Sequence, residues 1–144
     1  MNSPLVQLAD ALVNALNGHG FPQALNATRA YQPSFGLEEL NELRVTVVPK
    51  SAAIERAARD SDFIDCAVSI GLQRRVASDA EIDYLVNLAD DIVEALSAQV
   101  RLATMPTAVL IAIALEPAYS PEHLDEHRTF TSVITATYRV RRHA

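Results

Sequence analysis

The chain has 144 residues, 49% of them hydrophobic and 21% charged, a composition that fits one domain with an ordinary core. Its net charge of −6 argues against a broad nucleic-acid-binding face, and its single cysteine excludes an intrachain disulfide. The sequence shows no signal peptide and no apolar run of the roughly 18 residues that a membrane span needs. We therefore expect a single soluble domain, residues 1–144, that is made inside a cell.

The first element in the chain is an amphipathic helix. Ser3 followed by Pro4 is typical of a helix start, with serine as the N-cap and proline in the first turn. Leucines follow at helical spacing. Asn17 and Gly18 are expected to end this helix after three to four turns.

The next part of the chain is less regular. Residues 25–31 could form a short strand, and the acidic residues 37–42 form a loop or one short helix. Residues 43–48 are predicted to form a strand that Pro49 ends, because proline has no backbone donor. The pattern in residues 51–62 leaves two alternatives open, a helix or one arm of a hairpin.

A strand and a long helix follow. Residues 63–73 alternate between an apolar face and a small or polar one, which is typical of a strand with one buried face. Ser78 and Glu81 form a capping box at the start of a helix that extends to Leu96. This helix has a continuous apolar stripe and an acidic outer side, so we expect it to lie across a sheet.

Two further strands complete the predicted fold. Residues 107–115 are apolar on both faces, and we place this strand in the centre of the sheet. Residues 130–140 form a β-branched terminal strand, preceded by a charged, proline-bounded loop at residues 116–128. The element order predicts an α+β fold, with a mixed or antiparallel sheet of four to five strands and two main helices packed on one side.

The sharpest chemical motif is His123-Leu124-Asp125-Glu126-His127, which matches the H-x-x-E-H zinc pattern. A zinc site of this type needs a third protein ligand, and no acidic residue follows Glu126. A charged turn or an interface patch is therefore the preferred interpretation. No nucleophile motif or phosphate-binding loop is present, so we expect no catalytic residues, no bound metal and no cofactor.

Three stretches, taken in order, resemble the tail terminator (tail completion, minor tail) family of long-tailed bacteriophages. Residues 37–49 resemble its acidic turn and L-x-V-x-V-x-P strand, and residues 64–74 with the helix at 81–96 resemble its middle strand and helix. Residues 116–119 and then 124–138 resemble its D-P-x-Y … L-x-E-x-R-x-F-x-S-x-I-x-x-x-Y ending, with Glu116 in place of the aspartate. The resemblance covers about two-thirds of the chain, and none of its motifs is a catalytic signature.

The resemblance implies a structural virion protein and not an enzyme. Such proteins form a hexameric ring on the end of the tail tube, stop tube polymerisation and join the tail to the head or neck. The implied partners are further copies of the chain, the tail tube protein and a head-completion or neck protein. DNA passes through the ring without specific binding, and no membrane is involved. The implied location is the tail or neck of the virion, assembled in the host bacterial cytoplasm.

Charged and aromatic loop residues are the candidates for subunit or partner contacts. Aromatic residues in loops are enriched at interfaces, and the basic end of the chain could pair with an acidic surface of a neighbouring subunit or be solvated. The interface candidates are Phe35, Leu37, Glu38, Glu39, Leu40, Tyr119, His123, Arg128, Arg139 and Arg141. The competing hypotheses are another phage neck protein of the head-closure or stopper type, a small zinc-dependent hydrolase, and a generic α+β ligand-binding module.

Overall fold

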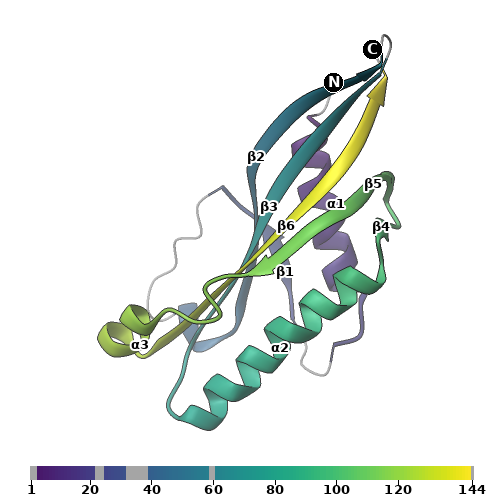
Figure 1. The fold of residues 1–144 in the computed structure, drawn as a ribbon. Helices are drawn as coiled ribbons and strands as arrows, with labels where there is room; N and C mark the ends of the chain where they lie inside the picture. Colours follow the sequence, from purple (N-terminus) through teal and green to yellow (C-terminus); the bar gives the residue numbers. More distant parts are fainter. Residues whose placement is uncertain (1–2, 22–24, 32–38, 59–60, 144) are drawn as a thin grey trace.

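The computed structural model of the chain describes residues 3–21, 25–31, 39–58 and 61–143 (Figure 1). The chain contains helices interspersed with single strands and pairs of consecutive strands. Their order is α1 (Pro4–Gly18), β1 (Ala27–Arg29), the 3-10 helix η1 (Glu39–Asn41), β2 (Arg44–Ala58), β3 (Ser61–Arg75), α2 (Asp79–Ala98), β4 (Arg101–Leu102), β5 (Met105–Leu115), α3 (Pro121–His127) and β6 (Thr129–His143). None of the helices in these described ranges is long and apolar enough to cross a membrane.

The strands form one mixed sheet in the order β1-β2-β3-β6-β5-β4, which curls into a half-barrel. β1 is parallel to β2, and every other neighbouring pair is antiparallel. The prediction of four to five strands is wrong, because the sheet has six. β4 has only two residues, and a strand of that length is too short to produce a period-two pattern.

One face of the central strands is the core of the protein. The covered side chains of β3 are between 0% and 3% exposed; they are Ile64, Cys66, Val68, Ile70 and Leu72. These five residues are the face predicted from the sequence. α1 and α2 contribute to the same buried cluster, with Leu8, Leu12 and Leu16 from α1 and Leu85, Ile92 and Leu96 from α2.

The predicted starts of the two long helices and the end of α1 are confirmed, although the Ser3 side chain makes no capping hydrogen bond and α2 continues two residues past Leu96 to Ala98. α1 begins at Pro4 and ends at Gly18. Just before its end, the Asn17 side chain accepts a hydrogen bond from the Ala27 N–H at 2.7 Å and donates one to the Ala27 carbonyl at 3.1 Å, which ties α1 to β1. At the start of α2, Ser78 Oγ accepts from the N–H of Glu81, and the Glu81 carboxylate accepts from the N–H of Ala77 at 2.6 Å.

Pro49 does not end its strand, contrary to the prediction. β2 continues to Ala58, with a register shift between Pro49 and Ser51. β1 pairs only with residues 45–47 of β2, so in the described part of the chain Pro49 lies where β2 has no neighbour on its outer side. A missing N–H is tolerated at an edge or a bulge, because no ladder bond is lost on the outer side. For the described residues of the range 51–62, the open alternative is resolved as strand: residues 51–58 belong to β2 and residues 61–62 to β3.

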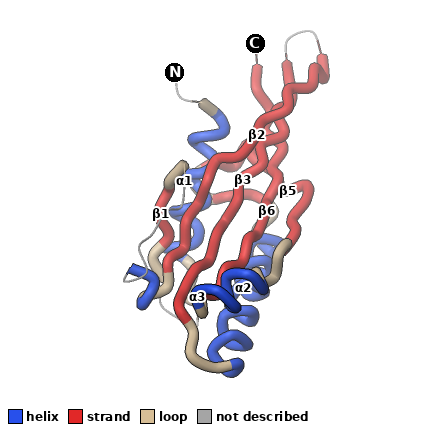
Figure 2. Tube along the Cα trace, turned by 90° about the vertical axis from the view of Figure 1, so that its left-hand side faces the viewer, coloured by secondary structure: helices blue, strands red, loops and turns tan. Residues whose placement is uncertain are grey.

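The hairpin arm and the end of β6 project past the rest of the protein. We call the arm residues 51–58, 61–65 and 139–143. Figures 1 and 2 show β2, β3 and β6 running side by side beyond β5 and α2. The long pairing of β3 with β6, from Ser61↔His143 to Arg75↔Thr129, joins the arm to the body of the sheet without interruption.

The central placement of β5 is also wrong, since β3 and β6 occupy the middle of the sheet. β4 pairs with β5 only at Met105 and Val109, and a further bond joins the Leu110 N–H to the carbonyl of Val100. Within the described ranges, no strand lies on the outer side of β5 after Leu110. Ile111 is 45% exposed there. An apolar pattern on both faces of a strand shows which side chains it carries, but it does not show which strands lie next to it in the sheet.

Candidate assembly surfaces

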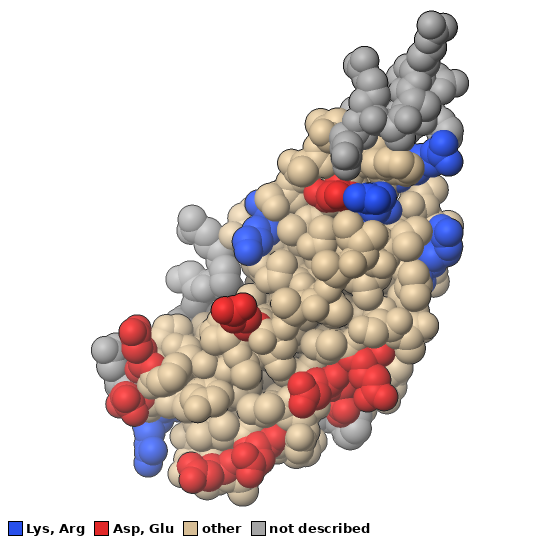
Figure 3. All heavy atoms as spheres, in the orientation of Figure 1, with Lys and Arg blue, Asp and Glu red and all other residues tan. Residues whose placement is uncertain are grey.

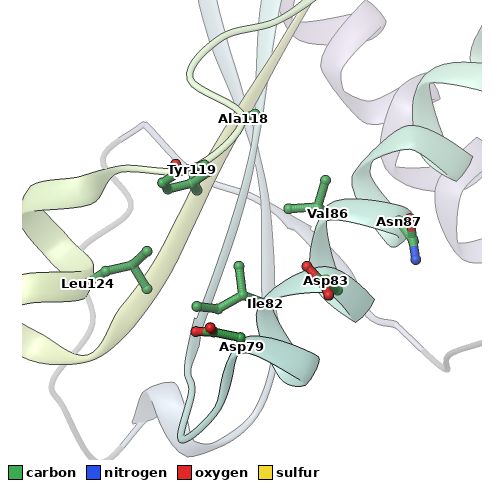
Figure 4. Close-up of a pocket in the computed structure, with 8 residues that line it drawn as sticks. All are labelled: Asp79, Ile82, Asp83, Val86, Asn87, Ala118, Tyr119 and Leu124. Carbon is green, nitrogen blue, oxygen red and sulfur yellow. The ribbon is translucent and has the colours of Figure 1, made fainter.

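A groove with acidic residues along its side lies between α2 and the segment that contains α3 (Figure 4). We call it the acidic groove. Its volume is about 850 Å³, which is enough for a small molecule or for several side chains of a partner. α2 contributes Asp79, Ile82, Asp83, Val86 and Asn87, and the opposite wall consists of Ala118, Tyr119 and Leu124.

The wall that carries Tyr119 is fixed to β6 by backbone hydrogen bonds. The Glu116 N–H donates to the Val133 carbonyl at 2.9 Å, and the Val133 N–H donates to the Pro117 carbonyl at 3.1 Å. The Ser120 N–H donates to the Thr131 carbonyl at 3.0 Å. Tyr119 is therefore held between two anchored residues, and its side chain is still 46% exposed.

The zinc-like motif lies on α3, beside this wall. Ser120 caps the helix by accepting a hydrogen bond from the N–H of His123, and the His123 ring nitrogen Nδ1 lies 2.7 Å from Thr131 Oγ1 on β6. The side chains of Glu126 and His127 lie outside the described set. Among the side chains that are described, no group of three His, Cys, Asp or Glu residues could hold a metal.

Arg128 ends α3 in the left-handed conformation, with φ 52° and ψ 37°. Its N–H donates to the carbonyls of His123 and Leu124, and its own carbonyl accepts from the Val76 N–H at 2.8 Å. The backbone of this residue therefore joins α3 to the segment between β3 and α2. Its side chain is exposed and available for contact with a partner.

A second groove lies on the uncovered face of the sheet, at the base of the arm. We call it the arginine groove. Its volume is about 590 Å³. Its lining residues are Phe63, Arg101, Pro106, Thr107, Val109, Ile111, Arg139 and Arg141. The arginine groove thus combines three guanidinium groups with an apolar floor.

Cross-strand contacts order the arginines of this groove. Arg139 forms a two-pronged ion pair with its strand partner Asp65, with Nε–Oδ1 at 2.8 Å and Nη2–Oδ2 at 3.0 Å. The hydrogen bond from Arg139 lowers the pKa of the Asp65 carboxyl. The guanidinium carbons of Arg139 and Arg141 lie 5.5 and 5.7 Å from the centre of the Phe63 ring, within the range of cation–π contacts.

Charge is separated along the molecule. The chain has 18 acidic and 12 basic residues, and six of the acidic residues lie on α2, which has no lysine or arginine. The remainder of the chain therefore has 12 of each sign. β6 has three arginines and no acidic residue. In Figure 3 most visible acidic side chains lie over the half with α2 and α3, and most visible basic ones lie toward the arm.

The structure places the predicted interface residues in different surroundings. Phe35, Leu37 and Glu38 lie outside the described residues. Glu39 begins η1, but its side chain is not among those described, whereas Leu40 is buried at 6% exposure and packs in the interior. Of the other five predicted residues, Tyr119 lines the acidic groove, and Arg139 and Arg141 line the arginine groove. His123 precedes the lining residue Leu124 on α3, and Arg128 ends that helix.

Sequence reasoning missed the residues that complete the grooves. Asp79 and Asp83 belong to an outer helix side that looked merely solvated, and Phe63 and Ile111 looked like ordinary strand residues. One signal was visible, namely the complete absence of basic residues from the sequence of α2. An exposed helix side usually mixes both signs, which stabilises it through pairs of opposite charge.

No family model matches the chain. The curated proteins likewise contain no match to it.

Proposed function

We propose that this protein is a structural virion protein that forms a ring at the end of a phage tail tube, stops tube polymerisation and joins the tail to the head or neck. The proposal starts from the resemblance of three ordered stretches to the tail terminator family. The structural observation that supports it most is the outer edge of β5. This edge has the character of a surface that another chain covers.

The edge consists of residues 111–115, with the sequence Ile-Ala-Ile-Ala-Leu. No charged residue interrupts it, and in the described part of the chain no strand pairs with it. Proteins normally protect an exposed strand edge with charges, prolines or bulges, because free N–H and C=O groups invite pairing with another chain. β5 has one bulge between Leu110 and Ala112 and otherwise leaves an apolar edge open.

The surface also offers two different contact regions, which a ring requires. A closed ring is built from heterologous contacts, in which one patch of each subunit meets a different patch of the next. The acidic groove and the arginine groove are two such patches, with opposite charge. The net charge of −6 further supports a ring through which DNA passes, because an acidic wall does not bind phosphates.

The test is the native mass of the purified protein, measured by light scattering over a concentration series and paired with negative-stain imaging. We expect hexameric rings with a central hole, or rings that form when isolated tail tubes are added and that stop tube elongation. Ile111→Lys should prevent ring formation, because it places a charge on the β5 edge. Tyr31→Lys is the matched control, since Tyr31 is 66% exposed and follows β1, which is separated from β5 by three strands of the sheet.

Two outcomes would overturn the proposal. A protein that stays monomeric both alone and with tail tubes does not act as a terminator. A protein that binds the portal assembly and not the tube end is a head-closure or stopper protein, the alternative that the same surfaces would serve.

A further inference from the structure

We propose that the arginine groove of one copy docks in the acidic groove of the next copy, so that the subunits contact each other head to tail. The inference rests on the proposed function, because it names the contact by which the ring would close. The second copy is favoured as the occupant because the two grooves complement each other in charge and in apolar surface.

The first argument is that each groove carries charge without a partner of opposite sign. Within the described residues, Asp79 and Asp83 form no ion pair. On the other side, Arg141 contacts the Phe63 ring, and Arg101 donates to the Pro106 carbonyl at 2.9 Å, but neither meets a carboxylate in the described part of the chain. Opposite charges at an interface fix the partner and its orientation.

The second argument is the apolar surface beneath the charges. Ile82, Val86 and Leu124 are half-buried in the acidic groove, beside the exposed ring of Tyr119. The arginine groove presents Ile111 at 45% exposure, together with the Phe63 ring. An apolar centre with an aromatic residue and an arginine rim is the usual composition of the strongest region of a protein interface.

The third argument is that one chain cannot bring its own two grooves together. Phe63 lies near the start of β3, and α2 begins four residues after Arg75, where β3 ends. The twelve residues from Phe63 to Arg75 span about 40 Å at roughly 3.3 Å per residue in an extended strand. The contact must therefore form between copies, and a contact between two different patches gives a ring if its rotation closes.

The experiment uses two charge-reversed variants of the full chain. The arginine variant is Arg101→Glu with Arg141→Glu, and the groove variant is Asp83→Lys with Asn87→Lys. All four side chains are exposed, and the changes leave the capping residues of α2 in place. Circular dichroism and thermal unfolding verify that each variant folds as the parent chain does.

We expect each variant alone to lose self-association by about 100-fold or more, because like charges then meet at the contact. An equimolar mixture of the two should assemble again. In the arginine variant both grooves are acidic, and in the groove variant both are basic, so every contact between the two variants joins opposite charges. A single chain that carries all four changes should also assemble. This pattern requires that the two grooves contact each other.

Two matched controls carry the same changes in net charge as the test variants, at residues that line neither of the two grooves. Lys50→Glu with Arg75→Glu controls for the arginine variant, and Glu94→Lys with Gln99→Lys controls for the groove variant. Glu94 is eleven residues along α2 from Asp83, which corresponds to about 16 Å at roughly 1.5 Å per residue. Both controls should assemble like the parent chain.

Rings that form normally from either variant alone would overturn this inference and leave the proposed function intact. Failure of the mixture and of the four-change chain to assemble would also overturn it. A parent chain that forms no ring even on tail tubes would instead refute the proposed function, and this inference with it.

Discussion

The two faces of the central strands differ sharply in composition and in surroundings. On β3 and β6 the covered face consists of large apolar residues packed beneath the helices, such as Ile70, Ile134 and Tyr138, all 0% exposed. In the body of the sheet the other face has mostly small or β-branched residues, such as Ser69 and Thr135, which are partly exposed, and toward the arm it carries the arginine groove. Both sets satisfy the preference for β-structure, so the difference lies in what each face contacts. The covered face stabilises the fold, and the uncovered face is free to serve assembly.

The largest expected effect is on the free energy of unfolding, and it can be compared between the two faces at two adjacent cross-strand pairs. Ile70 pairs with Ile134 on the covered face, and Ser69 pairs with Thr135 on the uncovered face. Ile70→Ala should lower the free energy of unfolding by about 3–4 kcal/mol, because it removes buried methyl groups and leaves a cavity. Thr135→Ala should lower it by less than about 1 kcal/mol. Urea unfolding at neutral pH measures both, and equal losses would contradict the division between the faces.

The next effect is a loss of stability at alkaline pH, which we expect from two buried groups on the covered face. Burial raises the pKa of the Cys66 thiol from 9.0 to about 11 and that of its strand partner Tyr138 from 10.0 to about 12. The folded state holds these protons more tightly than the unfolded state. The resulting stability is therefore complete below pH 9 and is lost as the pH rises through 11 and 12.

Each group should contribute up to about 3 kcal/mol to this alkaline loss. Tyr138→Phe should remove its share of the pH dependence between pH 10 and 12. At neutral pH the same change should cost little, since the Tyr138 hydroxyl has no hydrogen-bond partner among the described groups. Denaturant unfolding at a series of pH values provides the measurement. An unchanged alkaline slope in Tyr138→Phe would show that this hydroxyl does not titrate in a buried site.

The smallest expected effect is on the stability of the turn between α3 and β6, where the chain enters the strand that carries both faces. Arg128 has a positive φ of 52°, a conformation that costs a side chain about 1–2 kcal/mol and costs glycine nothing. Arg128→Gly should raise the free energy of unfolding by up to about 1 kcal/mol, and Arg128→Ala should not raise it. The melting temperatures of the two variants, compared with that of the parent chain, measure this difference. Equal melting temperatures for Arg128→Gly and Arg128→Ala would show that the backbone at this position is not strained.

Features carried by residues near each other in the chain were predictable. The Ser-Pro start of α1, the capping box at Ser78 and the alternation in β3 each follow from hydrogen bonds or side-chain directions within a few residues. The structure confirms each of them. The resemblance to a phage family, by contrast, is a sequence observation that the fold alone does not test.

Only the tertiary structure decided which strands lie at the edges and which side chains share a groove. Pro49 continues its strand because β1 is too short to cover that part of β2, and β5 has an open edge because β4 ends so soon. Tyr119 and Asp83 line one groove, although they lie more than thirty residues apart in the chain, because α2 and the segment before α3 both pack against β6. The amino-acid sequence by itself determined the two long helices and the alternation of β3, since these depend on local geometry, whereas α3 lies in a segment that the sequence pattern predicted as a loop. Strand order and the two grooves depend on pairing between distant segments, which no local pattern records.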